Sequence, residues 1–135
     1  MPSILFVCRH NACRSRIAEA IGRRLAPKAW SIDSAGSHPT RQVDPKASAV
    51  LRRNGLRMRR RNPQGFASLP RIEWDFVVDI SCEKAGILLP SKNYFQWDFP
   101  DPLDGPIELY ETLFRNLNEH IRDLFRGIEV GLDAS

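Results

Sequence analysis

Short, continuous apolar runs alternate with segments of helical periodicity along this 135-residue chain. The first apolar run, Ser3–Cys8, lacks polar alternation, which is typical of a strand covered on both faces. The next segment, Arg14–Leu25, repeats apolar residues at spacings of three and four, which indicates an amphipathic helix that stops at Pro27. The same reasoning predicts three further strands, over Trp30–Ser34, Asp75–Ile80 and Tyr94–Trp97.

Two more helices follow from end signals and periodicity. Asp44 and Pro45 have the chemistry of a helix start, and Asn54-Gly55 that of a helix end. From Ile107 to Ile128, apolar residues recur as in a long amphipathic helix. Alternation of strands and helices predicts one α/β sandwich domain over residues 1–135, built on a parallel sheet. Ligands of such folds bind beyond the carboxyl ends of the strands.

Composition supports a globular protein, with 42% hydrophobic and 27% charged residues. No apolar run is long enough for a membrane span or a signal peptide, so we expect a cytoplasmic protein without a membrane partner. The charge is uneven: residues 1–62 carry 14 Arg and Lys against three acidic residues, whereas residues 63–135 carry 6 against 13. This asymmetry indicates either an anionic ligand for the first half or an uneven solvated surface.

The three cysteines are an odd number, in a chain without a signal sequence, and therefore do not predict a disulfide framework. Cys8 ends the first predicted strand, and Arg14 opens the following helix. If the intervening residues form a cup, their backbone N–H groups and the helix N-terminus make an anion-binding nest. Arg14 adds a planar fork for a tetrahedral oxyanion, and Asn11 suits the left-handed conformation that such a loop requires.

The same surroundings favour a thiolate at Cys8, with Ser15 as a hydroxyl donor, and a thiolate beside a bound phosphate is a nucleophile. A buried cysteine that only packs is the alternative, but Cys, Asn, Arg and Ser together at a strand-to-helix junction favour the chemical role. A zinc site at Cys8, His10 and Cys13 lacks the usual spacing and a second ligand pair, so we predict no metal.

The segment VCRHNACRSRIAEA (residues 7–20) resembles the signature of low-molecular-weight protein tyrosine phosphatases and of the arsenate reductases that share their fold. The similarity continues at Ser34-Ala35-Gly36, at the strand ending near Ile80 and at Asp101-Pro102, and so covers nearly the whole chain. The resemblance implies a three-layer sandwich, in which a four-stranded parallel sheet has helices on both faces.

The resemblance also implies a mechanism. Cys8 attacks phosphorus and forms a phosphocysteine, Asp101 first protonates the leaving oxygen and then activates water, and Arg14 stabilises the oxyanion. Ser15 hydrogen-bonds the thiolate, while Asn11 and Ser34 shape the loop. No metal or organic cofactor is required. The implied oxyanion-binding residues are Arg9, His10, Asn11, Ala12, Cys13 and Arg14.

Departures from the phosphatase pattern leave two activities open. His10 replaces the usual glycine, and Cys82 after the third strand is similar to the reductases, but residues 83–91 lack the second cysteine of the thioredoxin-coupled relay. Cys82 could then work with an external thiol, and Cys13 could form a protective disulfide with Cys8. We favour a phosphatase acting on a phosphorylated protein or small phosphoester. Arsenate reduction with a thiol reductant is the alternative.

A third hypothesis is a binding module for phosphate or nucleic acid, based on the basic residues between Arg52 and Arg61. This stretch lacks the interleaved aromatic residues that stack on bases, and no nucleic-acid motif accompanies it. A solvated basic loop over residues 57–65 is the preferred interpretation. We therefore expect no nucleic-acid partner.

Overall fold

The structure is a computed structural model that describes the backbone of residues 2–133 and the side chains of residues 2–128. In this part of the chain a parallel sheet contains four strands in the order β2-β1-β3-β4. They are β1 (Ser3–Cys8), β2 (Ser31–Gly36), β3 (Trp74–Asp79) and β4 (Ser91–Gln96). The helices are α1 (Arg14–Leu25), α2 (Pro45–Arg53) and α3 (Ile107–Asp133), with a short 3-10 helix η1 (Phe66–Ser68).

The predicted α/β class and parallel sheet are confirmed, and the strand and helix ends shift by a few residues. Strand β2 continues through Ala35 and Gly36, because both residues pair with the end of β1, Gly36 opposite Cys8. Asp44 caps α2 by accepting a hydrogen bond from the backbone N–H of Lys46 at 2.9 Å. β1 and β3 are parallel neighbours, so their carboxyl ends lie side by side at one edge of the sheet. The loops that form the candidate site begin at this edge.

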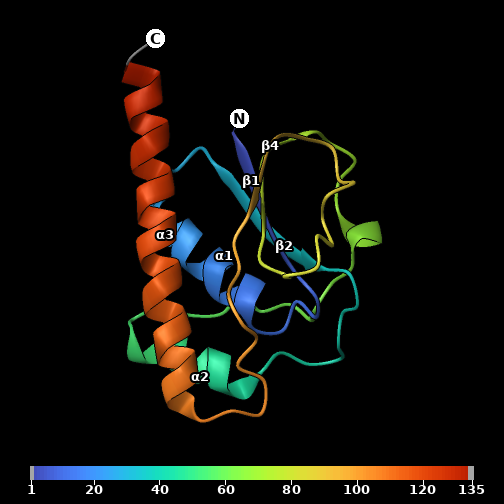
Figure 1. Ribbon diagram of the computed structural model, residues 1–135, viewed down its shortest axis with the longest axis vertical. Helices are drawn as coiled ribbons and strands as arrows, with labels where there is room; N and C mark the ends of the chain where they lie inside the picture. Colours follow the sequence, from blue (N-terminus) through green and yellow to red (C-terminus); the bar gives the residue numbers. More distant parts are fainter. Residues whose placement is uncertain (1, 134–135) are drawn as a thin grey trace.

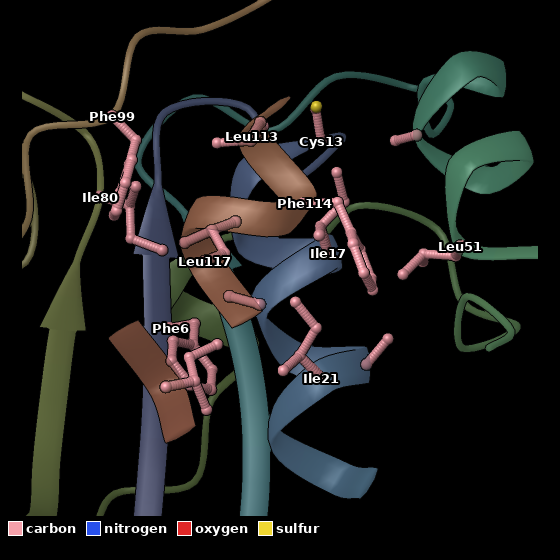
Figure 2. Close-up of a cluster of buried hydrophobic side chains, with 14 of the residues drawn as sticks. Phe6, Cys13, Ile17, Ile21, Leu51, Ile80, Phe99, Leu113, Phe114 and Leu117 are labelled. Carbon is pink, nitrogen blue, oxygen red and sulfur yellow. The ribbon is translucent and has the colours of Figure 1, made fainter. Parts of the chain in front are cut away.

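The α-helices α1, α2 and α3 cover one face of the sheet (Figure 1). Helix α1 packs between the sheet and α3, and α2 lies beside the first turns of α3. Figure 2 shows side chains from all of these elements meeting in one buried cluster, among them Phe6 of β1, Ile17 of α1, Leu51 of α2 and Leu117 of α3. This core fixes the start of α1 against the end of β1.

The helix on the opposite face of the sheet is the short 3-10 helix η1. No α-helix of the described residues covers Leu5, Val7 and Val77 on this face. They are covered by η1, by the loops on either side of η1 and by the loop before β4. The covering segments, residues 62–73 and 81–90, contain prolines and glycines and lack an apolar repeat of helical period. The second outer layer is thus irregular chain around a 3-10 turn.

The basic stretch 57–65 also differs from the solvated loop that its composition predicted. Arg61 contacts Asp33 at 2.8 Å and Arg59 contacts Glu19 at 3.2 Å, so two of its arginines bind acidic residues of β2 and α1. From below, the fully buried Arg16 donates from Nη2 to the carbonyl oxygens of Arg59 and Arg61, each at 2.7 Å. The stretch is folded onto the domain by its own charges.

Candidate active site

The loop between β1 and α1 is shaped by its carbonyl groups. The carbonyl oxygens of Cys8, Arg9, His10 and Ala12 accept hydrogen bonds from backbone N–H groups of residues 37–44, at 2.7 to 3.3 Å. These carbonyls therefore face the neighbouring segment. In the part of the chain that the structure describes, the N–H groups of Arg9, His10, Ala12, Cys13 and Arg14 have no protein acceptor. The loop is left with donors for an anion, as a nest requires.

Asn11 gives the loop its turn. Its φ of 52° is the left-handed conformation expected from the sequence. Its backbone N–H donates to Cys8 Sγ at 3.3 Å, and its side-chain oxygen accepts from the backbone N–H of Gln64 at 3.0 Å. Asn11 is fully buried, so these bonds fix both its backbone and the orientation of its amide.

A directed chain of hydrogen bonds runs from this amide to the sulfur. Asn11 Nδ2 donates to Ser15 Oγ at 2.8 Å and to Ser34 Oγ at 3.0 Å. Ser34 Oγ in turn donates to the carboxylate of Glu19 at 2.7 Å, because a carboxylate can only accept. Ser15 Oγ lies 2.9 Å from Cys8 Sγ. When Cys8 is a thiolate, which can only accept, the serine hydroxyl is the donor of this hydrogen bond. The backbone N–H of Asn11 and the Ser15 hydroxyl thus lie beside the sulfur of Cys8, which is only 2% exposed.

Arg14 is buried and oriented by two carbonyl groups from outside the loop. Its Nη1 donates to the carbonyl oxygens of Ile80 at 2.8 Å and Phe99 at 3.1 Å. Its Nη2 lies 3.8 Å from Asp101 Oδ2. Because Nη1 is engaged, the edge formed by Nε and Nη2 is the one that can bind an oxyanion in two-point fashion.

Asp101 is the aspartate of the 97–106 loop that reaches this site. Its Oδ2 faces Arg14 and lies 4.0 Å from His10 Nδ1, and its Oδ1 accepts from the N–H of Leu103 at 3.1 Å. Asp98, in the same loop, instead accepts from Gln96 Nε2 at 3.5 Å. Asp101 therefore stands at the mouth of the loop between two basic groups.

The three cysteines are free and lie in different environments. Cys82 is exposed, and its sulfur lies 3.8 Å from Arg14 Nη1 and 3.4 Å from the carbonyl oxygen of Phe99. Cys13 instead belongs to the buried core cluster (Figure 2). Burial, followed by the charges of Asp44 and Asp101, raises the pKa of the Cys13 thiol. Of the three thiols, Cys82 is the exposed one, and it lies beside Arg14 of the site.

Sequence reasoning missed several residues that build the site, above all Glu19, Gln64 and Asp79. Glu19 is buried at the far end of the hydrogen-bond chain, where Arg23 and Arg59 each approach it to 3.2 Å. In the sequence, the excess of basic residues near Glu19 is the signal that could have indicated a buried carboxylate as their partner. No group of three or more metal-ligating side chains occurs among the described residues, and none of their helices could cross a membrane.

A cleft of about 690 Å³ adjoins the loop. His10 and Ala12 line its side nearest to the loop, the segment 40–46 lines a second side, and Leu103 with Asp104 lines a third. The cleft can hold an organic group that is attached to a bound oxyanion, or a thiol that approaches one.

Comparison with known proteins agrees with this geometry. The family model described as low molecular weight phosphotyrosine protein phosphatase matches residues 3–133. The chain belongs to this family.

Within the low-molecular-weight phosphatase family, the chain is similar to arsenate reductases. It is 25% identical over 133 residues to the glutaredoxin arsenate reductase of Synechocystis sp., an alignment that covers 95% of this chain and 99% of that protein. The crystal structure of arsenate reductase from Archaeoglobus fulgidus matches with a TM-score of 0.78 and 27% identity, over 90% and 97% of the two chains. A structure of an arsenate reductase in the phosphate-binding state shares the fold, with a TM-score of 0.82, 22% identity and coverage of 95% and 99%. These relatives support the alternative activity more than the favoured phosphatase.

Proposed function

We propose that the protein is a thiol-dependent arsenate reductase, in which Cys8 binds arsenic and Cys82 completes the reduction. The observation that carries the proposal is the contact of Arg14 with both parts of the site. Its guanidinium belongs to the anion loop around Cys8, and its Nη1 lies 3.8 Å from the sulfur of the exposed Cys82. A phosphatase needs one thiol at this place, whereas a reductase needs two.

In the first step, the Cys8 thiolate attacks the arsenic of an arsenate held by the loop N–H groups and Arg14. A bond forms between Cys8 Sγ and arsenic, and one arsenate oxygen leaves as water after it is protonated. Arsenic remains As(V) in this adduct. The donors of the loop stabilise the negative charge on the remaining oxygens, and Asp101 at the mouth of the loop is placed to supply the proton.

In the second step, the thiolate of Cys82 attacks Cys8 Sγ. A disulfide forms between Cys8 and Cys82, the sulfur–arsenic bond breaks, and its electron pair stays on arsenic. Two thiols lose two electrons in total, and As(V) becomes As(III), which leaves as arsenite after protonation. The positive charge of Arg14 lies beside the sulfur that makes this attack, with Nη1 at 3.8 Å.

An external thiol must then reduce the Cys8–Cys82 disulfide. Residues 83–91 contain no cysteine, and Cys13 is buried with a raised pKa, which makes it a poor partner for exchange. A glutaredoxin, a thioredoxin or a low-molecular-weight thiol can supply the electrons. A reducing compartment such as the cytoplasm suits this chemistry.

The test is arsenite release from arsenate, with glutathione plus glutaredoxin, with thioredoxin and its reductase, and with glutathione alone. We expect turnover with at least one system, no turnover for Cys8→Ser, and a loss of about a hundredfold or more for Cys82→Ser, since an external thiol must replace an intramolecular one. Cys13→Ala, which keeps the backbone N–H of the loop and an apolar side chain in the core, serves as the matched cysteine control and should retain activity. No arsenite with any reductant, or full activity of Cys82→Ser, contradicts the proposal.

One observation favours phosphatase activity as a second function of the same loop. Asp101 lies 3.8 Å from Arg14, where a general acid for a leaving alkoxide is needed. Hydrolysis of p-nitrophenyl phosphate should then depend on Cys8 and Asp101 but not on Cys82. Asp101→Asn should lower this hydrolysis by about a hundredfold. Equal rates for the wild type and Cys8→Ser would exclude a phosphocysteine intermediate.

A further inference from the structure

A buried aspartate that takes no direct part in this chemistry organises the turn that carries Cys82. Asp79, the last residue of β3, is fully buried. Its Oδ1 accepts from the backbone N–H of Ser81 at 3.0 Å and from the Ser81 hydroxyl at 2.6 Å. Its Oδ2 accepts from the N–H of Gly86 at 2.8 Å and from the hydroxyl of Tyr94 at 2.6 Å. One carboxylate thus ties together both ends of the turn and the neighbouring strand β4.

Ser81 extends this control into the turn. Its Oγ accepts from the backbone N–H groups of Glu83 at 3.2 Å and Ala85 at 3.1 Å. Gly86 packs so closely that an added Cβ would lie 3.2 Å from Val7 and 3.4 Å from the Asp79 carboxylate. The backbone on both sides of Cys82 is therefore fixed by the Asp79–Ser81 pair.

Cys82 itself adopts a conformation that disfavours any residue but glycine. Its φ is 62°, in the left-handed region, which costs a non-glycine residue about 1 kcal/mol or more. Such a conformation persists where its surroundings determine it. Lys84 in the same turn is also left-handed, with a φ of 55°, so the turn holds two residues in this conformation. The cysteine is held there despite the strain, and its sulfur is thereby brought to Arg14.

A second link joins the turn to the anion loop. Arg9 of the loop forms an ion pair with Glu83, next to Cys82, at 3.0 Å. Both side chains are about two-fifths exposed, so this pair contributes little to stability. Its main effect is to orient the turn and the anion loop toward each other. The buried Asp79 network is the part that sets the position.

We propose that Asp79 and Ser81, with Tyr94 as the closing donor, are positioning residues that hold the Cys82 thiol at Arg14 for attack on Cys8. This inference rests on the proposed reductase function but concerns only its second step. Loss of the network should slow formation of the Cys8–Cys82 disulfide and leave the binding of oxyanions by the loop unchanged. The network therefore affects kcat and not the affinity for phosphate or arsenate.

The variants Tyr94→Phe and Ser81→Ala test the inference, and Asp79→Asn is the stronger third change. Single-turnover reactions with arsenate are quenched by acid and alkylated, and the disulfide is quantified by peptide mass. We expect disulfide formation to slow by about tenfold or more in Ser81→Ala, while protection of Cys8 from iodoacetamide by phosphate stays at the wild-type level. Thr112→Val, which removes a hydroxyl bonded within α3, is the control and should leave both readouts unchanged.

A double-variant comparison separates positioning from general destabilisation. In a Cys82→Ser background, residual turnover is driven by a high concentration of an external small thiol, and there Tyr94→Phe and Ser81→Ala should have no further effect. Equal slowing in the presence and absence of Cys82 overturns the inference, as does a wild-type rate of disulfide formation in all three variants. If Asp79→Asn fails to fold, the two milder variants decide the question.

An arm without arsenate keeps this inference distinct from the proposed function. Diamide removes two electrons and two protons from a pair of thiols and forms a disulfide, and its own N=N bond is reduced to a hydrazine. Cys8–Cys82 disulfide formed in this way should slow in the same variants even if the wild type does not reduce arsenate. Absence of this disulfide in diamide-treated wild type overturns the positioning role, whatever the outcome with arsenate.

Discussion

Ser15 Oγ lies 2.9 Å from Cys8 Sγ, and the serine hydroxyl is the donor of this hydrogen bond once Cys8 is a thiolate, which can only accept. Asn11 Nδ2 donates a hydrogen bond to Ser15 Oγ at 2.8 Å. The same amide donates to Ser34, whose proton goes to Glu19. Glu19 thus anchors one end of a hydrogen-bond chain whose other end is the Cys8 sulfur.

Replacing Ser15 by alanine should therefore make Cys8 a slower nucleophile. A hydrogen bond to a charged group contributes about 1.5 kcal/mol or more, so we expect alkylation by iodoacetamide at neutral pH to slow by about tenfold. The measurement is made in Cys82→Ser, which removes the exposed competing thiol. Thr112→Val is the hydroxyl control. An unchanged alkylation rate would show that Ser15 accepts from the thiol and does not donate to the thiolate.

The approach of β2 to the anion loop gives a second prediction. A Cβ added to Gly36 would lie 2.5 Å from the carbonyl oxygen of Arg9 and 2.8 Å from the backbone nitrogen of Asn11. Both are backbone atoms of the loop, so neither can move without changing the cup. Gly36→Ala should lower stability by about 1–3 kcal/mol and weaken the protection of Cys8 by phosphate.

A glycine elsewhere in the chain provides the control for this change. An added Cβ at Gly127, on the exposed side of α3, would meet nothing within 4 Å. Gly127→Ala should stabilise the helix by about 0.5–1 kcal/mol and leave phosphate protection unaltered. Urea denaturation and the alkylation assay measure the two effects. Full phosphate protection in Gly36→Ala would mean that the loop tolerates the added methyl group.

Much of this architecture follows from the sequence, because local patterns determine it. The spacing from Cys8 to Arg14, between an apolar run and a helical repeat, was enough to predict a loop between the first strand and the first helix. Asp79 was not predictable in the same way. It interrupts an apolar strand, and its partners come from a turn and from β4, so that its role exists only in the folded chain. The layer of η1 and loops on the second face of the sheet was not predictable either, because its sequence lacks hydrophobic residues at a regular spacing.

The basic stretch illustrates the same limit. Arg59 and Arg61 look like a solvated run in the sequence, since Glu19 and Asp33 lie more than 25 residues away from them. Only the folding of α1 beside β2 brings those carboxylates into reach. Charge counts over half of the chain therefore described neither the buried ion pairs nor the buried Arg14 beside the Cys8 loop.

Arg16 provides a test of that buried arrangement. Its guanidinium is 1% exposed and donates to three backbone carbonyls of residues 59–62, and burial lowers its pKa. Arg16→Met should cost about 2–3 kcal/mol, because it leaves these carbonyls without their donor, and should speed hydrogen exchange of the Gln64 N–H that binds Asn11. Arg60→Met, in an exposed arginine of the same stretch, should change stability by less than about 0.5 kcal/mol. Similar losses in both variants would contradict the anchoring role.

Two tyrosine–aspartate pairs predict a loss of stability in alkali. Burial, followed by the hydrogen bond to Asp79, raises the pKa of Tyr94, and burial with the bond to Asp44 raises that of Tyr110. An unfolded tyrosine releases its proton near pH 10, about the usual value, whereas the folded protein retains both protons to higher pH. Above pH 10 the folded state therefore binds more protons than the unfolded state. These two tyrosines leave the free energy of unfolding constant below pH 10. Above pH 10 each of them lowers it by up to about 1.4 kcal/mol per pH unit.

Urea denaturation between pH 8 and pH 11 measures this slope, and Cys13, whose raised pKa acts in the same direction, contributes equally to every variant compared. Above pH 10, Tyr94→Phe should reduce the slope of unfolding free energy against pH by the contribution of about one proton, and Tyr110→Phe by that of another. Both variants should also be less stable at pH 8, because each loses a hydrogen bond. The double variant should leave the shallower pH dependence of Cys13. If the slope above pH 10 is the same in the wild type and the double variant, the phenols ionise in the folded protein as readily as in the unfolded chain, and the two hydrogen bonds do not hold their protons.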